Sequence, residues 1–272
     1  MAIAQRGTNF PELVEIMKKL LAPAPDGCPW DREQTLQTLE PFLIEEAYEV
    51  LEAIDTDDAR EHCEELGDLL FQIVFQAELR AREGKFGIED VVRAIATKMI
   101  RRHPHVFGDL KVKDSDEVLA NWGKLKEAEH KEKGIQRRAL EGVPVNLPAL
   151  LRAQRLGEKA AAVGFDWPDI KGVREKVDEE LREIDEAVSG GDRAQIEHEL
   201  GDLLLAVSRL SAKLGVAPED ALRSALRRFQ SRFEAMEDRV IARGAKVAET
   251  PLEELDRIWN EVKKVQPPLP KK

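Results

Sequence analysis

Cysteine, tyrosine and long apolar runs are all scarce in this chain of 272 residues. Its two cysteines, Cys28 and Cys63, lack the spacing of a metal site, which argues against a disulfide-built fold and favours a reducing, cytoplasmic location. No apolar run reaches the roughly 18 residues that a membrane-spanning helix needs, and the first residues lack the apolar region of a signal peptide. We therefore expect no membrane partner.

Basic residues are outnumbered as well. The 42 lysines and arginines stand against 53 acidic residues, for a net charge of −11, which argues against general binding to nucleic acid. A local basic cluster that binds a phosphorylated small molecule is not excluded. With one tyrosine, nine phenylalanines and few β-branched runs, the chain has little material for a large sheet. The composition indicates a helix-rich protein, and the length suffices for two domains.

Acidic residues, by contrast, are abundant and stand in two opposed groups in the second half of the chain. Glu180 and Glu183 lie in one helical pattern, and Glu199 and Asp202 lie in the next. The pairs Glu183/Glu199 and Glu180/Asp202 are both centred on Gly191, a helix-ending residue. Residues equidistant from the turn of an antiparallel helical hairpin face each other. The four carboxylates are therefore expected to converge.

Such a convergence calls for a positive partner. Carboxylates held in a small volume repel one another and raise each other's pKa. A hard divalent cation with oxygen ligands relieves that repulsion, and Mg²⁺ is the usual one. The alternative interpretation is an acidic face that is simply exposed to solvent and holds no ion.

The same arrangement occurs earlier in the chain. Glu46 with Asp68, and Glu49 with Glu65, are both centred on position 57. The sequence thus predicts an all-α protein: a tandem repeat of helical-bundle domains, each built on an αα-hairpin with EExxE…ExxD carboxylates. We place an N-terminal domain at 1–135, a linker at 136–147 and a C-terminal domain at 148–272.

One position distinguishes the two hairpins chemically. Lys176 lies one helical turn before Glu180 on the same face, whereas the equivalent position before Glu46 is Phe42. A cation beside a metal-binding cluster suits a polyphosphate, because the metal and the cation share its negative charge. The alternative is that Lys176 is an ordinary surface partner of Glu180.

The remaining helices are predicted from apolar periodicity and helix breakers. Asp58 and Asp192 are expected N-caps of the second helix of each hairpin, and Pro41 is expected in the first turn of its helix. Further helices are expected at 10–21, 88–102, 114–131, 218–243 and 252–265, the fourth with Leu222, Leu226, Phe229 and Phe233 facing inward.

Three smaller features admit more than one interpretation. Trp30 is either a core anchor or a lid on a ligand. His103 and His105 flank a proline, either as turn and packing residues or as metal ligands. Glu127 and His130 form one Glu-x-x-His, but a di-iron bundle needs two such pairs, so we interpret them as surface residues.

Taken together, these motifs resemble the MazG family of all-α nucleoside triphosphate pyrophosphohydrolases. The stretches that carry the resemblance are GCPWDREQT (27–35), EELGDLLFQ (64–72), RRHPHVF (101–107), LPALLRAQ (147–154), VGFDW (163–167) and HELGDLL (198–204). The resemblance implies Mg²⁺-dependent hydrolysis of nucleoside triphosphates to monophosphates and pyrophosphate, with Mn²⁺ as an alternative metal. It also implies a homodimer of helical domains and a housecleaning role with a broad range of bases.

The resemblance further implies roles for individual residues, with the C-terminal domain as the better candidate for activity. These roles cover the metal, the phosphates and the nucleotide. The implied metal ligands are Glu180, Glu183, Glu199 and Asp202. The implied phosphate-binding residues are Lys176, Arg228 and Arg232, and Trp259 is implied to lie against the nucleotide.

The acidic cluster of the N-terminal domain keeps all its acids. We interpret it as a second metal site with a structural or regulatory role, because Phe42 stands where the other domain has a lysine. An active site there is the other interpretation. Its residues are Glu46, Glu49, Glu65 and Asp68.

No arrangement of Ser, Cys or His indicates a covalent intermediate, which favours direct attack of water on the α–β phosphate linkage. Glu179 is the candidate general base, since it adjoins the predicted metal ligands without being needed as one. Its alternative role is a solvent-facing partner of a nearby cation. The rival function is a non-catalytic, metal-dependent nucleotide sensor or scaffold.

Overall fold

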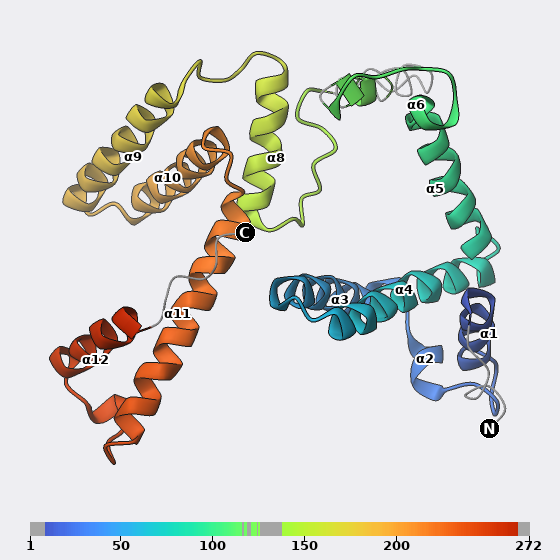
Figure 1. The fold of residues 1–272 in the computed structure, drawn as a ribbon, viewed down its shortest axis with the longest axis horizontal. Coiled ribbons are helices and arrows are strands. Elements are labelled where there is room, and N and C mark those ends of the chain that lie inside the picture. Colours follow the sequence, from blue (N-terminus) through green and yellow to red (C-terminus); the bar gives the residue numbers. More distant parts are fainter. Residues whose placement is uncertain (1–8, 116, 119–120, 124, 126–137, 266–272) are drawn as a thin grey trace. The chain divides into compact units, whose positions relative to one another are not determined.

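The computed structural model describes residues 9–265, apart from 116, 119–120, 124 and 126–137 (Figure 1). The described residues form helices and connecting loops, with no β-strand among them, which confirms the predicted all-α class. The chain divides into two compact units, Met1–Lys133 and Gly134–Lys272. The domain limits given above stay predictions, because the expected linker begins outside the described part.

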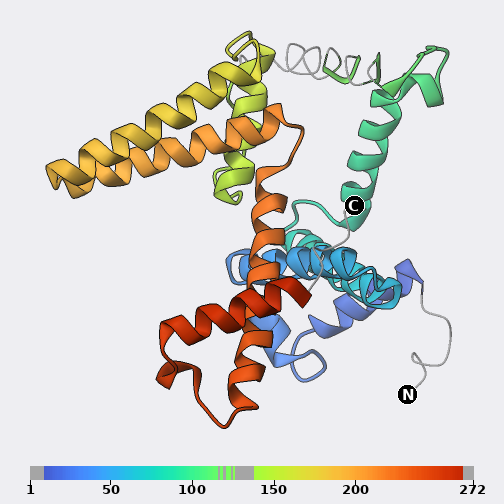
Figure 2. The ribbon, with the colours of Figure 1, turned by 60° about the vertical axis from the view of Figure 1, so that its left-hand side comes forward.

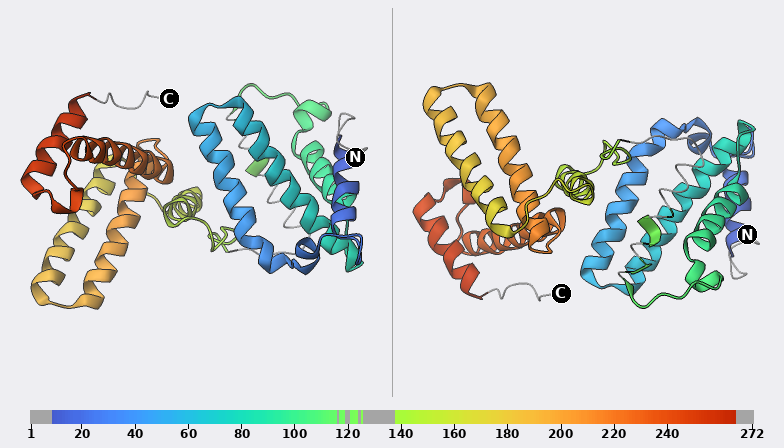
Figure 3. Two further views of the ribbon diagram at one scale, coloured as in Figure 1. Left: turned by 90° about the horizontal axis from the view of Figure 1, so that it is seen from below. Right: turned by 90° about the horizontal axis from the view of Figure 1, so that it is seen from above.

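The first unit is built on two long antiparallel helices, α3 (Leu36–Thr56) and α4 (Ala59–Arg82) (Figure 3). Helix α1 (Phe10–Leu20) packs on α4 and completes a core of Met17, Leu21, Leu39, Val74 and Phe75. Other helices whose limits the structure gives in this unit are α2 (Pro29–Glu33), α5 (Ile88–Arg102) and α6 (Pro104–Phe107). The helix predicted at 114–131 lies largely outside the described residues.

The second unit repeats the hairpin with α9 (Ile170–Gly190) and α10 (Arg193–Lys213), which lie side by side in Figures 2 and 3. Helix α8 (Ala149–Ala162) packs on α10. A long helix and a terminal helix then form a helical pair with its own core of Met236, Val240, Ile258 and Val262. These are α11 (Pro218–Ile241) and α12 (Leu252–Val265), joined through the 3₁₀ turn η1 (Val247–Glu249).

Each hairpin turns at the residue on which its acidic pairs are centred. Asp57 and Gly191 both adopt the left-handed backbone conformation, with φ of 58° and 70°. Glycine enters that region freely, and aspartate is among the few other residues that tolerate it. Asp58 and Asp192 follow as the predicted N-caps, each accepting two backbone N–H bonds through its carboxylate. Local backbone chemistry thus fixes the centre about which the acids face each other.

The prediction for Pro41 was wrong. Pro41 lies inside α3 rather than in its first turn. The helix begins earlier because Thr35 and Thr38 form a reciprocal capping box, with backbone-to-hydroxyl distances of 3.2 and 2.8 Å. This pairing uses a threonine where the usual pattern has Glu or Gln, so the sequence pattern did not indicate it.

The predicted inward face of the long helix was also wrong. Its four apolar residues are 38% to 58% exposed, because α12 buries this face only toward the C-terminal end of α11, at Met236 and Val240. A continuous apolar stripe is left open to solvent along the helix. It consists of Leu222, Leu226, Phe229 and Phe233.

The structure decides between the interpretations left open for Trp30 and His103. Trp30 is 52% exposed and stacks edge-on against Phe42, so it is not a core anchor. The His103 ring lies 2.7 Å through Nδ1 from the Met99 carbonyl and packs against Trp122, as a turn and packing residue does. Glu127 and His130 lie outside the described residues. Cys28 and Cys63 are not joined to each other, and no described helix is long and apolar enough to cross a membrane.

Candidate functional site

Three acids of the second hairpin meet between α9 and α10. One carboxylate oxygen from each of Glu180, Glu199 and Asp202 lies within 4.8 Å of the others. Glu180 and Glu199 are buried, with exposed fractions of 2% and 7%, and Asp202 is half-buried. Buried carboxylates are rare unless a positive partner compensates for their lost hydration. These acids therefore form a candidate metal site in which two of the three carboxylates are withdrawn from solvent.

Glu183 adjoins this group as the fourth acid. Partial burial raises the pKa of its carboxyl, and the negative charges of Glu180 and Glu199 raise it further. Loss of hydration and nearby like charges both favour the neutral form of a carboxyl group. The structure thus brings Glu180, Glu199 and Asp202 together, with Glu183 near enough for the charges of Glu180 and Glu199 to affect its pKa.

Lys176 is the cation of the site. Its Nζ lies 2.6 Å from Glu180 Oε1 and 3.1 Å from Glu179 Oε1. Hydrogen bonds to Glu180 and then Glu179 raise the pKa of Lys176 above its ordinary value, so it stays charged. Glu180 is buried, which excludes the interpretation of an ordinary surface pair.

One oxygen of Glu180 lacks a partner. Oε1 contacts Lys176, but Oε2 is buried and makes no hydrogen bond. A buried carboxylate oxygen that stays unsatisfied is costly unless something outside the chain binds it. The donor set around it consists of carboxylate oxygens, the ligand type that Mg²⁺ prefers. The residues present therefore fit a hard divalent cation.

His198 is a neighbour that the motif analysis missed. Its Nε2 lies 3.4 Å from Asp202 Oδ2, one helical turn away on α10. The spacing of four residues was visible in the HELGD stretch, and a histidine beside a metal-binding carboxylate commonly orients it. The equivalent residue of the first hairpin is Glu64, which pairs with Arg60 instead.

A cluster of ion pairs that the sequence did not predict joins the loop before α9 to the C-terminal end of α10. Asp166, in the loop before α9, pairs with Arg209 and, at 2.7 Å, with Lys213. Lys213 also donates a 2.6 Å hydrogen bond to the carbonyl of Trp167. Arg209 crosses α8 at Gly157, where any Cβ would meet the guanidinium at 2.0 Å. The cluster ties the loop to α10, and it joins residues too distant in sequence for a spacing rule to reveal.

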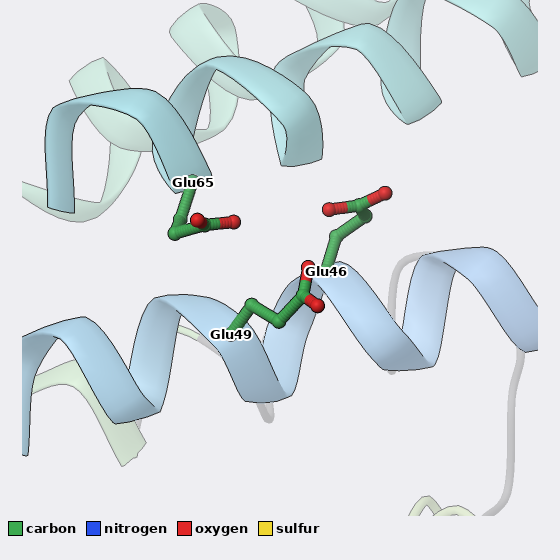
Figure 4. Close-up of side chains that lie close together, drawn as sticks. All are labelled: Glu46, Glu49 and Glu65. Carbon is green, nitrogen blue, oxygen red and sulfur yellow. The ribbon is translucent and has the colours of Figure 1, made fainter. Parts of the chain in front are cut away.

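The first hairpin assembles a similar acidic group. Glu46 and Glu49 on α3 point toward Glu65 on α4, with one oxygen of each within 4.8 Å of the others (Figure 4). Partial burial raises the pKa of Glu46, and so do a hydrogen bond with Glu49 and the charge of Asp68. Phe42 stands in the place of Lys176 and packs against the ring of Trp30. This group holds its acids without a lysine beside them.

The basic and aromatic residues predicted to bind substrate lie elsewhere in the second unit. Arg228 and Arg232 lie on α11, and the Trp259 ring packs against Phe229, with ring centres 5.5 Å apart. Among the described helices, α12 packs extensively on α11 alone. Within the described residues, none of these three side chains makes a hydrogen bond or ion pair with the acids. The carboxylate of Glu179 accepts a hydrogen bond from Lys176. This contact matches the alternative interpretation of Glu179 as the partner of a nearby cation.

Comparisons with known proteins bear on both hairpins. A family model described as the MazG nucleotide pyrophosphohydrolase domain matches residues 34–107 and 170–236. A nucleoside triphosphate pyrophosphohydrolase of Escherichia coli K12 is 44% identical over 256 residues, covering 93% of this chain and 96% of that protein. The nucleoside triphosphate pyrophosphohydrolase/pyrophosphatase MazG of Thermotoga maritima is 46% identical over 259 residues, covering 95% and 97%.

A solved structure is also similar to part of the chain. The crystal structure of a MazG-related protein from Thermotoga maritima matches 43% of this chain and 98% of its own, at 27% identity and a TM-score of 0.38. Each of the two segments that the family model matches contains one of the acidic hairpins.

Proposed function

This chain belongs to the MazG family, and from that premise we propose that it hydrolyses nucleoside triphosphates to monophosphates and pyrophosphate at the acidic hairpin of its second unit. The observation that carries the proposal is the buried Glu180, paired with Lys176 through one oxygen and unsatisfied at the other. A metal ion would satisfy the free oxygen of Glu180, and a phosphate chain would accept hydrogen bonds from Lys176.

The proposed metal is Mg²⁺, with Mn²⁺ as the alternative, held by the four acids of the second hairpin. A bound divalent ion supplies positive charge that polarises phosphate oxygens and makes water a better nucleophile. The four acids would hold such an ion, and the short contact to Lys176 keeps Glu180 oriented. The residues concerned are Glu180, Glu183, Glu199 and Asp202.

Lys176 is proposed to bind the phosphate chain. Its ammonium is half-buried and permanently charged, so it can donate to phosphate oxygens while it retains a carboxylate partner. Glu179 is the proposed general base. Its carboxylate is 45% exposed and held 3.1 Å from Lys176, next to where the phosphates would lie. In that position it can accept a proton from an attacking water.

The first unit is proposed to bind a metal in a structural or regulatory role rather than to hydrolyse substrate. Its acids are assembled, but Phe42 cannot donate to a phosphate. A triphosphate carries about four negative charges at neutral pH, and an acidic cluster without an adjacent cation repels what its metal does not neutralise.

The chain is further proposed to act as a homodimer that clears nucleotides with a broad range of bases. Exposed apolar side chains on the second unit support the dimer, because patches of this kind mark protein interfaces. They lie on α9, α10 and α11 and include Leu181, Leu200, Leu204, Leu205, Leu226 and Phe229. The unpaired Cys28 and Cys63 are consistent with the proposed cytoplasmic location.

Release of pyrophosphate from a panel of nucleoside triphosphates, with and without Mg²⁺, tests the proposal. We expect Mg²⁺-dependent release of pyrophosphate with no release of orthophosphate, across several bases. Binding of triphosphate and metal without any product would instead indicate the nucleotide sensor. Release of orthophosphate would place the cleaved bond at the wrong phosphorus and overturn the proposed reaction.

A further inference from the structure

We propose that the ion-pair cluster of Asp166, Arg209 and Lys213 is a positioning device for the metal site of the second hairpin. The cluster holds α9 and α10 at the separation at which carboxylates from both helices can bind one divalent ion. This inference rests on the proposed function and adds positioning residues to the same site. None of the three side chains is assigned a contact with substrate.

The two helices that carry the acids are joined covalently at one end only, through the turn at Gly191. Glu183 and Glu199 lie eight residues from that turn, and Glu180 and Asp202 lie eleven residues from it. Carboxylates gathered in this way repel one another and push the helices apart when no ion is bound. Mg²⁺ demands a near-ideal octahedral arrangement of oxygens, so a small change in helix separation weakens its binding.

The cluster lies on the other side of the acids from the turn. In the register centred on Gly191, Arg209 is level with Val173, since each is eighteen residues from the turn. Arg209 follows Asp202 by seven residues, or about 10 Å along α10. The acids therefore lie between a covalent connection and an ionic one, and the hairpin is held together on both sides of them.

The contacts within the cluster are directional and largely withdrawn from solvent. The side chains of Arg209, Asp166 and Lys213 are 11%, 23% and 25% exposed. One carboxylate oxygen of Asp166 binds Arg209, and the other lies 2.7 Å from Lys213 Nζ. Lys213 also donates a 2.6 Å hydrogen bond to the Trp167 carbonyl. The loop that leads into α9 cannot leave α10 without breaking these bonds, which solvent screens less than it screens exposed pairs.

Two glycines allow three helices to close around the cluster. A Cβ on Gly157 of α8 would lie 2.0 Å from the Arg209 guanidinium, and a Cβ on Gly172, in the first turn of α9, would lie 2.6 Å from the Trp167 ring. Helix α8 packs on α10, and Figure 2 shows it at the end of the α9–α10 pair away from the turn. The backbones are thus fitted to the side chains of the cluster.

The first hairpin has an apolar layer at the same place. The positions equivalent to Arg209 and Lys213 are Phe75 and Leu79, and both belong to the core that α1 completes with Met17. Apolar packing is non-directional, whereas ion pairs and hydrogen bonds have preferred distances and angles. The directional closure therefore belongs to the hairpin that also carries a lysine beside its acids, the one to which we assign catalysis.

Mn²⁺ binding to the full chain, measured by electron paramagnetic resonance, tests the positioning role without relying on activity. Every chain compared carries Glu49→Gln and Glu65→Gln, so that the acidic group of the first hairpin does not mask the second. Lys213→Met should raise the dissociation constant for Mn²⁺ about tenfold, the low end of what changes around metal ligands cause. Lys213→Arg keeps a charged donor and should stay within about twofold of its parent.

Arg82→Met is the matched control, in the first unit. Arg82, near the end of α4, donates hydrogen bonds to the Leu21 and Lys18 carbonyls, so the change also unties a hairpin from the segment packed on it. It should leave Mn²⁺ binding unchanged. Circular dichroism confirms that each chain is folded under the conditions of the titration. If Lys213→Met fails to fold, Asp166→Asn replaces it, with the same expected shift.

Pyrophosphate release gives a second measurement, in chains without the two glutamine changes. The Mg²⁺ concentration for half-maximal rate should rise about tenfold in Lys213→Met, in step with the weaker metal binding. The rate at saturating Mg²⁺ should stay within about threefold of wild type, because a bound ion draws the acids together again. A fall of the saturated rate with unchanged Mg²⁺ dependence would contradict a role in positioning the metal ligands.

The outcomes separate this inference from the function beneath it. A Lys213→Met chain that binds Mn²⁺ as tightly as its parent overturns the positioning role, whether or not the protein is an enzyme. Equal weakening by Arg82→Met overturns it too, because the effect would then be a general loss of stability. A wild type that binds Mn²⁺ but releases no pyrophosphate overturns the proposed function alone, and one that binds no Mn²⁺ overturns both.

Discussion

The ammonium of Lys176 lies 2.6 Å from a carboxylate oxygen of Glu180, a residue that is only 2% exposed. The pair joins a half-exposed cation to a buried anion at a spacing of one helical turn on α9. The lysine thus compensates one oxygen of Glu180 and leaves the other buried without a hydrogen bond.

Lys176→Met should destabilise the metal-free protein, because the buried carboxylate of Glu180 loses its partner. We expect about 2 kcal/mol, below the range for fully buried pairs since Lys176 is 35% exposed. Urea unfolding with and without Mg²⁺ measures it, and Mg²⁺ should recover part of the loss. Lys171→Met is the control, because its 3.8 Å pair with Glu175 is exposed. Equal effects of the two changes would contradict the structural role of Lys176.

Glu180→Gln and Glu46→Gln should differ in their effect on catalysis. The first change removes a charge beside the proposed phosphate site, and we expect turnover to fall on the order of a hundredfold. The second alters the cluster next to Phe42 and should leave turnover within about threefold of wild type. Steady-state pyrophosphate release measures both. Equal losses would mean that the first hairpin is an active site too.

Glu179→Gln tests the general base. The amide keeps the size of the side chain but cannot accept a proton, so we expect kcat to fall by about a hundredfold or more. Mg²⁺ should still stabilise this variant against heat, since the four acids remain. Retention of full turnover would assign Glu179 to its other role, the partner of Lys176.

Glu183→Gln should change how the stability of the metal-free protein depends on pH. The folded pKa of Glu183 lies above 4.5, so the native state binds its proton more tightly and loses stability as pH rises through that raised pKa. The Gln variant has no carboxyl group to ionise at this position, so its stability does not fall for this reason. In the presence of a chelator, the melting temperature of the variant relative to wild type should therefore increase between pH 4.5 and pH 8. A gap that stays constant would show that Glu183 does not feel the other acids.

Asp166→Asn should have the opposite pH signature. The hydrogen bond from Lys213 holds the pKa of Asp166 below 3.8, and Arg209 lowers it further. The ionised form therefore stabilises the fold above pH 3.8, and that stabilisation is lost as pH falls through the depressed pKa. We expect the variant to be about 2 kcal/mol less stable at pH 7, because two cations lose their shared anion. The difference should shrink steadily as pH falls below 3.8 toward the depressed pKa, which urea unfolding across pH would show.

Local sequence determined the helices, the hairpin turns and the membership of the acidic clusters. The limits of α5 and α12 agree with their apolar periodicity, and Gly191 and Asp192 end one helix and begin the next as predicted. These features depend on residues a few positions apart, which is the range over which helical periodicity and capping operate. Residues equidistant from a hairpin turn face each other, so the sequence also predicted which acids meet across each hairpin.

Contacts between elements remote in sequence were decided only by the tertiary structure. It showed that Glu180 is buried with a free oxygen, and that Asp166 binds Arg209 across 43 positions. It also showed that the apolar stripe with Phe229 faces solvent, where its periodicity had predicted burial. Periodicity shows that a helix has an apolar face, but packing decides what covers that face. For α11 the described chain covers this face only toward the C-terminal end, where α12 packs on Met236 and Val240.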